Sequence, residues 1–319
     1  FRKFQAKLRA IRSKLQRIAF GDNVTRYFPE ALVGNYAVNP HNGYRYWYDY
    51  FEHETPDAPA LLDQRARYRE WNHEFGHCGY TFAMPVVYTW YPTFGWYDFE
   101  PKDYRWFYNM LLVTSNAGQH TSQRTPIIPF VHWHTTAPPD NPDPSVEQFS
   151  KEKYQELLWH MLLRGHDTFF LWCTGPELAT EIQLVHEVYR ESLQYSGFID
   201  RGVPIEFDVP SKPGPVVSGL RLGNRVLARR TDFGTGTGNE TLAVAGGGEV
   251  SVAAKRGVQI LTVEQKSRHP GILSDHNGRL RFPIGFYEFP GEKEKLQRMA
   301  QSGINLVRCS NRASLDSAH

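Results

Sequence analysis

The sequence predicts an α/β protein: half of a (β/α)8, TIM-barrel-like fold, followed by a small antiparallel β-sandwich domain. Two observations predict this fold. Within residues 1–202, short apolar segments of strand length alternate with helical segments, and repeated strand–helix units build a parallel sheet. After residue 202 the composition shifts to short stretches rich in Val, Gly and Thr, separated by turn residues, a pattern typical of antiparallel strands.

The strand-like segments are near-continuously apolar, which suits a parallel sheet that is covered on both faces. They are residues 31–38, 81–88, 127–134 and 168–173. Four units make half of an eight-stranded barrel, so we expect adjacent parallel strands in this order. An open doubly wound sheet is the alternative. Pro85 and Pro129 lie inside two of the segments, where each removes a hydrogen-bond donor.

Helical periodicity separates the strands. Residues 1–19 carry apolar side chains at three- and four-residue spacing and a basic opposite face. Such a helix can bind membrane surfaces or acidic partners, but the strand that follows closely favours an ordinary barrel helix with a solvated face. Ser150 and Gly165 fit the N-terminal and C-terminal caps of another helix. The further expected helices are 62–75, 102–117, 150–164 and 176–195.

The rest of the chain is expected to form two more parts. In 203–266, a hairpin over residues 216–230 turns at Gly223-Asn224 and precedes further short strands, which predicts a separate antiparallel β domain. In 278–319, a strand, a helix and a second strand follow each other. This β–α–β order predicts the start of a further barrel-like unit. The expected half barrel before these two parts is residues 1–202.

Composition argues against several classes of function. There are 36 Lys and Arg against 34 Asp and Glu, a formal charge of +2, so the overall charge balance does not imply a nucleic-acid partner. No apolar run is long enough for a membrane helix. No glycine-rich nucleotide motif follows a strand, and the three cysteines are too scattered for a disulfide framework or a zinc site. We therefore expect no cofactor and no membrane partner, while the compartment and the oligomeric state stay open.

Aromatic residues are abundant, at 14% of the chain. Flat Trp and Tyr side chains stack on sugar rings, although a bulky core would use them too. In a barrel the active site lies where the strands end at their carboxyl termini. The expected substrate-binding residues at these ends are Asn35, Tyr36, Trp90, Tyr91, His132, His134 and Trp172.

A resemblance to a family strengthens this interpretation. Phe282–Tyr287 together with Met299–Arg308 resembles the first strand, first helix and second strand of barrel glycoside hydrolases. Residues 31–195 are similar to the later half of such a barrel in architecture and aromatic content. The resemblance implies a glycoside hydrolase-like protein that acts on, or binds, a polysaccharide or oligosaccharide.

Glycoside hydrolysis normally requires two carboxyl groups. Glu177 follows the last predicted strand, and Asp98 lies in an aromatic loop, so these two are the candidate catalytic residues. Alternatively, Glu177 is a carboxylate at a helix start, where the helix dipole favours it, and Asp98 is a solvated loop charge. His132 and His134 alternate along one strand and share a face. They would contact sugar hydroxyls or, in a metal-dependent hydrolase, ligate a metal. A non-catalytic carbohydrate-binding protein is the remaining alternative.

Overall fold

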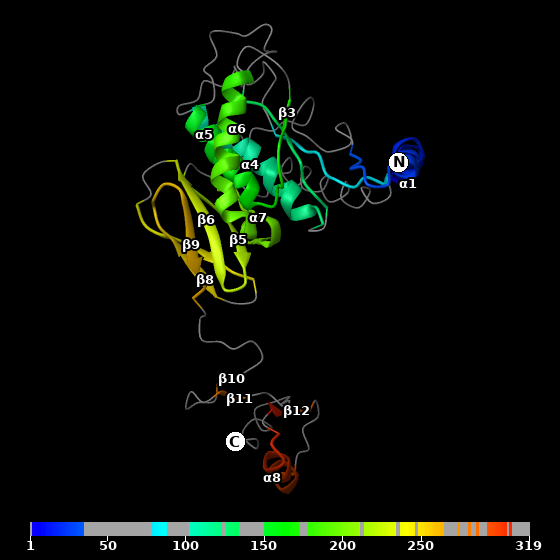
Figure 1. The fold of residues 1–319 in the computed structure, drawn as a ribbon. Helices are drawn as coiled ribbons and strands as arrows, with labels where there is room; N and C mark the ends of the chain where they lie inside the picture. Colours follow the sequence, from blue (N-terminus) through cyan, green and yellow to red (C-terminus); the bar gives the residue numbers. More distant parts are fainter. Residues whose placement is uncertain are drawn as a thin grey trace. The chain divides into compact units, whose positions relative to one another are not determined.

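The structure of the chain is a computed structural model. The described residues are 2–34, 78–87, 102–122, 125–133, 150–172, 178–210, 214–233, 237–245, 248–264, 273–274, 280–281, 285–286, 292–304 and 306–307. The chain forms two compact units, one of residues 1–242 with 250–263 and one of residues 243–249 with 264–319. The described part is mixed α/β, with a parallel sheet and several antiparallel ones (Figure 1).

A parallel sheet forms the centre of the first unit. Its strands β1 (Val86–Val87), β2 (Phe130–Val131) and β3 (Phe170–Leu171) pair in the order β1-β2-β3, which confirms three of the expected parallel neighbours. Residues 31–34 lie beside the chain that leads into β1, because the Val33 carbonyl accepts a hydrogen bond from the Thr81 amide at 2.7 Å. The rest of the 31–38 prediction lies outside the described residues, and the described strands do not close a barrel.

The two prolines remain part of the sheet by acting as acceptors. The Pro85 carbonyl accepts from the Phe130 amide at 2.9 Å, and the Pro129 carbonyl accepts from the Phe170 amide at 2.8 Å. Proline lacks only the donor half of a strand position. Its carbonyl therefore still links one strand to the next, and both prolines are tolerated in a short parallel ladder.

Helices flank the sheet strands along the chain. The order is α1 (Arg2–Gln16), the π-helical segment η1 (Arg17–Asp22), α2 (Asn23–Tyr27), α4 (Lys102–His120), α5 (Lys151–Leu163), α6 (Leu178–Ser192), the short η5 (Leu193–Tyr195) and α7 (Ser196–Arg201). The Ser150 hydroxyl accepts a hydrogen bond from the Lys153 amide, and Gly165 takes the left-handed φ of 92°. Both predicted caps of α5 are thus confirmed, whereas the predicted helix 62–75 lies outside the described residues.

The core lies between α4, α5 and one face of the sheet. Phe107 and Leu111 of α4, Leu157 and Trp159 of α5, and Val131 of β2 are buried together. At the end of α4 the two helices touch through backbone: a Cβ atom added to Gly118 would lie 2.0 Å from the Arg164 carbonyl oxygen. Glycine is required here because the approach leaves no room for a methyl group.

A four-stranded antiparallel sheet follows the helices in the first unit. Its strands β4 (Val203–Pro204), β5 (Pro215–Leu222), β6 (Arg225–Asp232) and β9 (Val258–Thr262) pair in the order β4-β5-β6-β9. Leu222 pairs with Arg225 across the predicted turn at Gly223-Asn224. A separate hairpin joins β7 (Glu240–Ala243) to β8 (Glu249–Val252). The antiparallel pairing expected after residue 202 is present.

Polar side chains join this sheet to α5. Glu156, His160 and Arg164 stand four residues apart on the helix, so they form one ridge, here called the α5 ridge. His160 hydrogen-bonds Ser218 of β5 at 2.7 Å and Thr231 of β6 at 3.0 Å. Each ridge position therefore meets a polar partner on the sheet, as expected of polar side chains at a buried interface.

Glu156 and Arg164 complete the α5 ridge at its two ends. Arg229 holds the Glu156 carboxylate with two hydrogen bonds of 2.8 Å. Arg164 is fully buried and donates to Ser218, Ser115 and the carbonyls of Asp208 and Val217. Burial lowers the pKa of Arg164 to about 10, so the guanidinium stays charged at neutral pH and needs all these acceptors.

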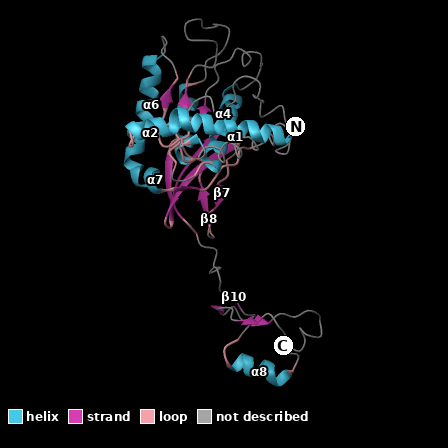
Figure 2. Cartoon of the chain, turned by 90° about the vertical axis from the view of Figure 1, so that its right-hand side faces the viewer, coloured by secondary structure: helices cyan, strands magenta, loops and turns pink. Residues whose placement is uncertain are grey.

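The second unit contains two small β pairs. Strands β10 (Leu273–Ser274) and β11 (Leu280–Arg281) are antiparallel. Strands β12 (Gly285–Phe286) and β13 (Leu306–Val307) are parallel and are joined through α8 (Lys293–Gln301). Figure 2 shows α8 beside these short strands. The interpretation of this β–α–β order as the start of a barrel-like unit stays a prediction.

We expect Gly118→Ala to destabilise the chain by about 1–3 kcal/mol, the usual cost of overpacking. Alanine favours helix by about 1 kcal/mol, but the clash with the Arg164 carbonyl outweighs that gain because backbone has to move. Urea denaturation measures the change. The matched control is Gly238→Ala, where an added Cβ meets nothing within 4 Å. Equal stability of Gly118→Ala and the wild type would contradict the close helix contact.

We also expect stability to fall in mild acid. Burial lowers the pKa of His160 well below its usual value and that of His166 to about 3. Unfolded histidine binds a proton near pH 6.5 whereas these folded residues do not, so the unfolded state gains protons first as pH falls. Each residue then costs about 1.4 kcal/mol of unfolding free energy per pH unit below about 6.5.

Urea midpoints between neutral pH and mild acid test this expectation. His160→Gln removes one titrating group, so its stability is lower overall but depends less steeply on pH. His186→Gln, on the partly exposed part of α6, is the control. A His160→Gln profile that parallels the wild type would show that His160 is not the source of the acid sensitivity.

Candidate functional site

The candidate site lies where the parallel strands end. His132 and Trp133 directly follow β2, and Trp172 directly follows β3. Parallel strands end at the same edge of a sheet, so these residues share one rim. Of the predicted site residues, the structure describes His132 and Trp172. Those that lie outside the described residues are Asn35, Tyr36, Trp90, Tyr91, Asp98, His134 and Glu177.

A buried carboxylate, Glu181, organises this rim. Its Oε1 accepts a hydrogen bond from the Trp133 amide at 3.0 Å and another from the Tyr154 hydroxyl at 2.7 Å. Its Oε2 lies 3.4 Å from Nδ1 of His132. Glu181 is only 1% exposed. A buried carboxylate is costly unless donors surround it, and here a strand end and a helix supply them.

The first turns of two helices bring these groups together. Tyr154 is in the first turn of α5, and Glu181 is in the first turn of α6. Both helices are preceded by sheet strands, so their N-terminal turns lie at the carboxyl edge of the sheet. The helix N-terminus itself also favours a negative charge at Glu181. Tertiary packing therefore concentrates polar side chains at this edge.

Electrostatics keep Tyr154 in its donor form. Burial raises the pKa of Tyr154 well above its ordinary value, and the charge of Glu181 and its hydrogen bond raise it further. The phenol therefore keeps its proton throughout the physiological range. This proton is what holds Glu181 in place, and Glu181 in turn faces the ring of His132.

The side chain of His132 is buried and is not exposed at the rim. Its side chain is 2% exposed and lies against the Glu181 carboxylate. The Nδ1 edge of the ring faces a carboxylate oxygen at 3.4 Å, so the ring is held against the buried Glu181. This placement is expected of a residue that positions others.

Aromatic side chains gather on one face of the sheet. The Phe130 ring lies 5.4 Å from Phe170 and 5.7 Å from Trp172, measured between ring centroids, and Phe82 lies 6.2 Å from Phe170. Side chains alternate along a strand. Val131 accordingly enters the main core while Phe130 packs in a separate cluster with Phe82. Phe170 is 40% exposed and Trp172 is half-buried, so this aromatic wall has an open side.

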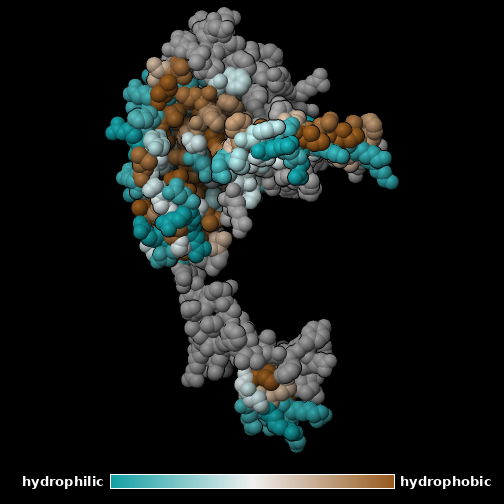
Figure 3. All heavy atoms as spheres, turned by 45° about the vertical axis from the view of Figure 1, so that its right-hand side comes forward, coloured by the Kyte–Doolittle hydropathy of each residue, from teal (hydrophilic) through white to brown (hydrophobic). Residues whose placement is uncertain are grey.

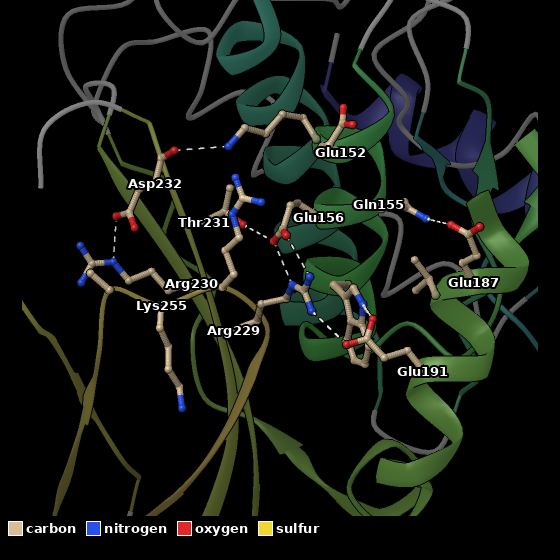
Figure 4. A pocket seen from close by; sticks show the side chains of 15 residues that line it. Glu152, Gln155, Glu156, Glu187, Glu191, Arg229, Arg230, Thr231, Asp232 and Lys255 are labelled. Atoms are coloured by element: carbon tan, nitrogen blue, oxygen red, sulfur yellow. Dashed lines mark hydrogen bonds and ion pairs between the residues drawn. The ribbon is translucent and has the colours of Figure 1, made fainter. Parts of the chain in front are cut away.

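A polar pocket of about 520 Å³ lies elsewhere, between α5, α6 and the antiparallel sheet (Figure 4). Arg229 lies at its centre, stacked over Trp159 at 5.0 Å and 3.8 Å from a Glu191 oxygen. Burial raises the pKa of Glu156. The hydrogen bonds and the charge of Arg229 act in the opposite direction, and the net pKa is below the usual value. Arg229 thus pairs with Glu156 and Glu191, and these ion pairs join the antiparallel sheet to α5 and α6.

The metal alternative finds no ligand cluster in the described part of the chain. No group of three or more His, Cys, Asp or Glu residues there is arranged to hold a metal ion. His134, the second member of the proposed histidine pair, lies outside that part. The same ranges contain no helix that is both long and apolar enough to span a membrane.

Comparison with known proteins identified no relative: no family model, curated protein or solved structure matches the chain. The geometry of the rim therefore carries the functional argument.

Sequence reasoning missed Glu181 and Tyr154. Glu181 comes four residues after Glu177 in the same expected helix. Tyr154 and Glu181 each lie in the first turn of a helix that follows a strand. The polar first turn of a helix after a parallel strand was the available signal. Burial, which makes Glu181 important, depends on partners far away in the sequence.

We expect Tyr154→Phe to destabilise the chain by about 1–3 kcal/mol, because it deprives a buried carboxylate of a donor. Thermal and urea unfolding measure the change. Tyr189→Phe on the exposed side of α6 removes the same hydroxyl and is expected to be neutral. Equal effects of the two substitutions would show that the Glu181 network does not stabilise the rim.

Proposed function

We propose that this chain is a glycoside hydrolase-like protein that binds or acts on an oligosaccharide or polysaccharide at the carboxyl edge of its parallel sheet. The Glu181 network carries the proposal, because it fixes His132 and Trp133 at the edge where barrel enzymes place their sites. Buried polar networks of this kind are costly. A costly network at the ends of parallel strands therefore suggests that side chains are positioned there for a function.

The aromatic wall supports the same class of ligand. Phe130, Phe170 and Trp172 form a set of ring contacts beside the rim. Sugar rings present apolar faces and hydroxyl edges, so they are recognised by aromatic faces together with a few oriented polar groups. Within the first unit, the sheet edge carries an aromatic wall with an open side, next to polar groups that are buried and fixed in position.

The finer architecture belongs to the same proposal. Strands β1, β2 and β3 are parallel, and helices α4 and α5 separate them along the chain. This order is typical of a (β/α)8 barrel. An open sheet, the alternative fold, would contain the same local units. The resemblance of the 282–308 region to barrel glycoside hydrolases points the same way.

The residues would divide the work by their environment. Glu177 and Asp98, which lie outside the described residues and precede α6 and α4 in the sequence, are the proposed acid and its partner. Hydrolysis of a glycosidic bond by this route protonates the leaving oxygen with one carboxyl group, while the other acts as base or nucleophile. Glu181 has both oxygens engaged and is buried, so it is a positioning residue in this scheme.

Calorimetric titration with a panel of neutral, N-acetylated and uronic-acid oligosaccharides tests the proposal. We expect binding of one class, weakened about tenfold or more by Trp172→Ala and by His132→Ala, since about 1.4 kcal/mol corresponds to each tenfold change. Glu177→Gln is expected to weaken binding too. Glu187→Gln on the exposed side of α6 is the control, and thermal unfolding verifies that each variant folds.

An assay of reducing-end release separates a glycosidase from a carbohydrate-binding protein. Release that is lost in Glu177→Gln and Asp98→Asn supports catalysis by this carboxyl pair. Binding without release supports the non-catalytic alternative. Absence of binding to the whole panel, or binding unchanged in Trp172→Ala and His132→Ala, would overturn the proposed site.

A further inference from the structure

Helix α1 displays its apolar side to solvent. Phe4, Leu8, Ile11, Leu15 and Ile18, here called the α1 stripe, are each at least 50% exposed. Figure 3 shows them as a continuous hydrophobic row along the projecting helix. Meanwhile Ser13, on another side, is buried. An uncovered row of large apolar side chains of this size marks an interaction surface.

The pattern of the α1 stripe indicates a groove as its partner. Its members alternate at four- and three-residue spacing, which gives the narrow seam that packs between other helices or strands. The flanks are strongly basic, because residues 2–21 contain seven basic residues and no acidic one. These are Arg2, Lys3, Lys7, Arg9, Arg12, Lys14 and Arg17. A fitting partner is apolar and acidic.

The same unit carries such a partner surface beside β3. A groove of about 570 Å³ runs between β3 and α6 and is lined by Leu171, Ile182, Val185, Tyr189, Leu193 and Ile199 together with polar residues. Ile182, Tyr189 and Leu193 are each about half exposed. Its acidic lining residues are Asp167 and Asp200, and His186 also lines it. This β3–α6 groove is thus apolar and acidic.

The α1 stripe and the β3–α6 groove belong to opposite edges of the parallel sheet. The segment that follows α1 and α2 hydrogen-bonds through Val33 to Thr81, ahead of β1. Strand β3 is last in the described order β1-β2-β3. In Figure 1, α1 and α6 accordingly lie on different sides of the sheet. Within one molecule the two surfaces therefore do not face each other.

We propose that the occupant of the β3–α6 groove is the α1 stripe of a second copy of this chain. The contact is head-to-tail: the α1 stripe of one copy binds the groove of the next, and its own groove, at the other edge, stays free for a further copy. Basic flanks of α1 then approach Asp167 and Asp200. Pairing of α1 with itself is disfavoured, because Lys7, Arg12 and Lys14 flank the seam and would face like charges.

Sedimentation velocity of the 319-residue chain over a concentration series tests the association. The weight-average mass of the wild type is expected to rise above that of the monomer as concentration increases, and to rise less at high salt. Ile11→Glu in the stripe and Ile182→Glu in the groove are each expected to raise the dissociation constant at least about tenfold. Ile260→Glu, at a comparably exposed position on β9, is the matched control and keeps the association.

Mixing the variants gives the decisive arm. Chains with Ile11→Glu keep an intact groove, and chains with Ile182→Glu keep an intact stripe, so an equimolar mixture restores one contact and forms mixed dimers. Three outcomes overturn the proposal: a wild type that stays monomeric, dissociation by the stripe variant alone, which indicates α1 self-pairing, and a mixture that stays monomeric. Vesicles of phosphatidylcholine and phosphatidylserine are added to the monomer. Stripe-dependent binding to them without self-association identifies a lipid surface instead and also overturns it.

Discussion

The buried polar contact between α5 and the antiparallel sheet is the constraint on which the first unit depends. His160 and Arg164 are buried and Glu156 is mostly buried, so each needs its partners at hydrogen-bonding distance. Apolar surfaces tolerate small slides past one another, whereas a buried guanidinium between Ser115, Ser218 and backbone carbonyls does not. The α5 ridge therefore fixes the position of the helix along the sheet as well as its distance from it.

That fixed helix also determines the rim of the parallel sheet. Tyr154 lies two residues before Glu156, and its hydroxyl holds Glu181 of α6. Gly118 permits the other end of α5 to touch α4 through its backbone. A single helix thus connects the antiparallel sheet, the core and the carboxylate beside His132. We therefore expect a disturbance at the ridge to affect the candidate site, because the same helix carries both.

The two edges of the parallel sheet carry different chemistry from its centre. The centre is closed by α4 and α5, whose apolar residues are buried with Val131. The α1 stripe is apolar with basic flanks, and the β3–α6 groove is apolar with acidic lining residues. The proposed sugar site depends on the strand ends, whereas the proposed self-association depends on the strand edges. The two proposals can therefore stand or fall independently.

Local pattern was sufficient for much of the fold. The apolar runs around 86, 130 and 170 identified three parallel neighbours, Ser150 and Gly165 identified the ends of α5, and Gly223-Asn224 identified a hairpin. These features depend on residues close in sequence: periodicity, capping and turn geometry act over a few positions. For the same reason His132 and Trp172 could be assigned to strand ends before any contact was known.

By itself, then, the sequence determined the order and type of these elements and the edge of the sheet where polar and aromatic residues gather. Only the tertiary structure decided that Glu181 is buried against Trp133 and Tyr154, that Arg164 bridges two layers, and that the apolar side of α1 faces outward. Burial and pairing join residues tens of positions apart, so no local pattern encodes them. Whether a charge is solvated or enclosed is decided when the layers pack.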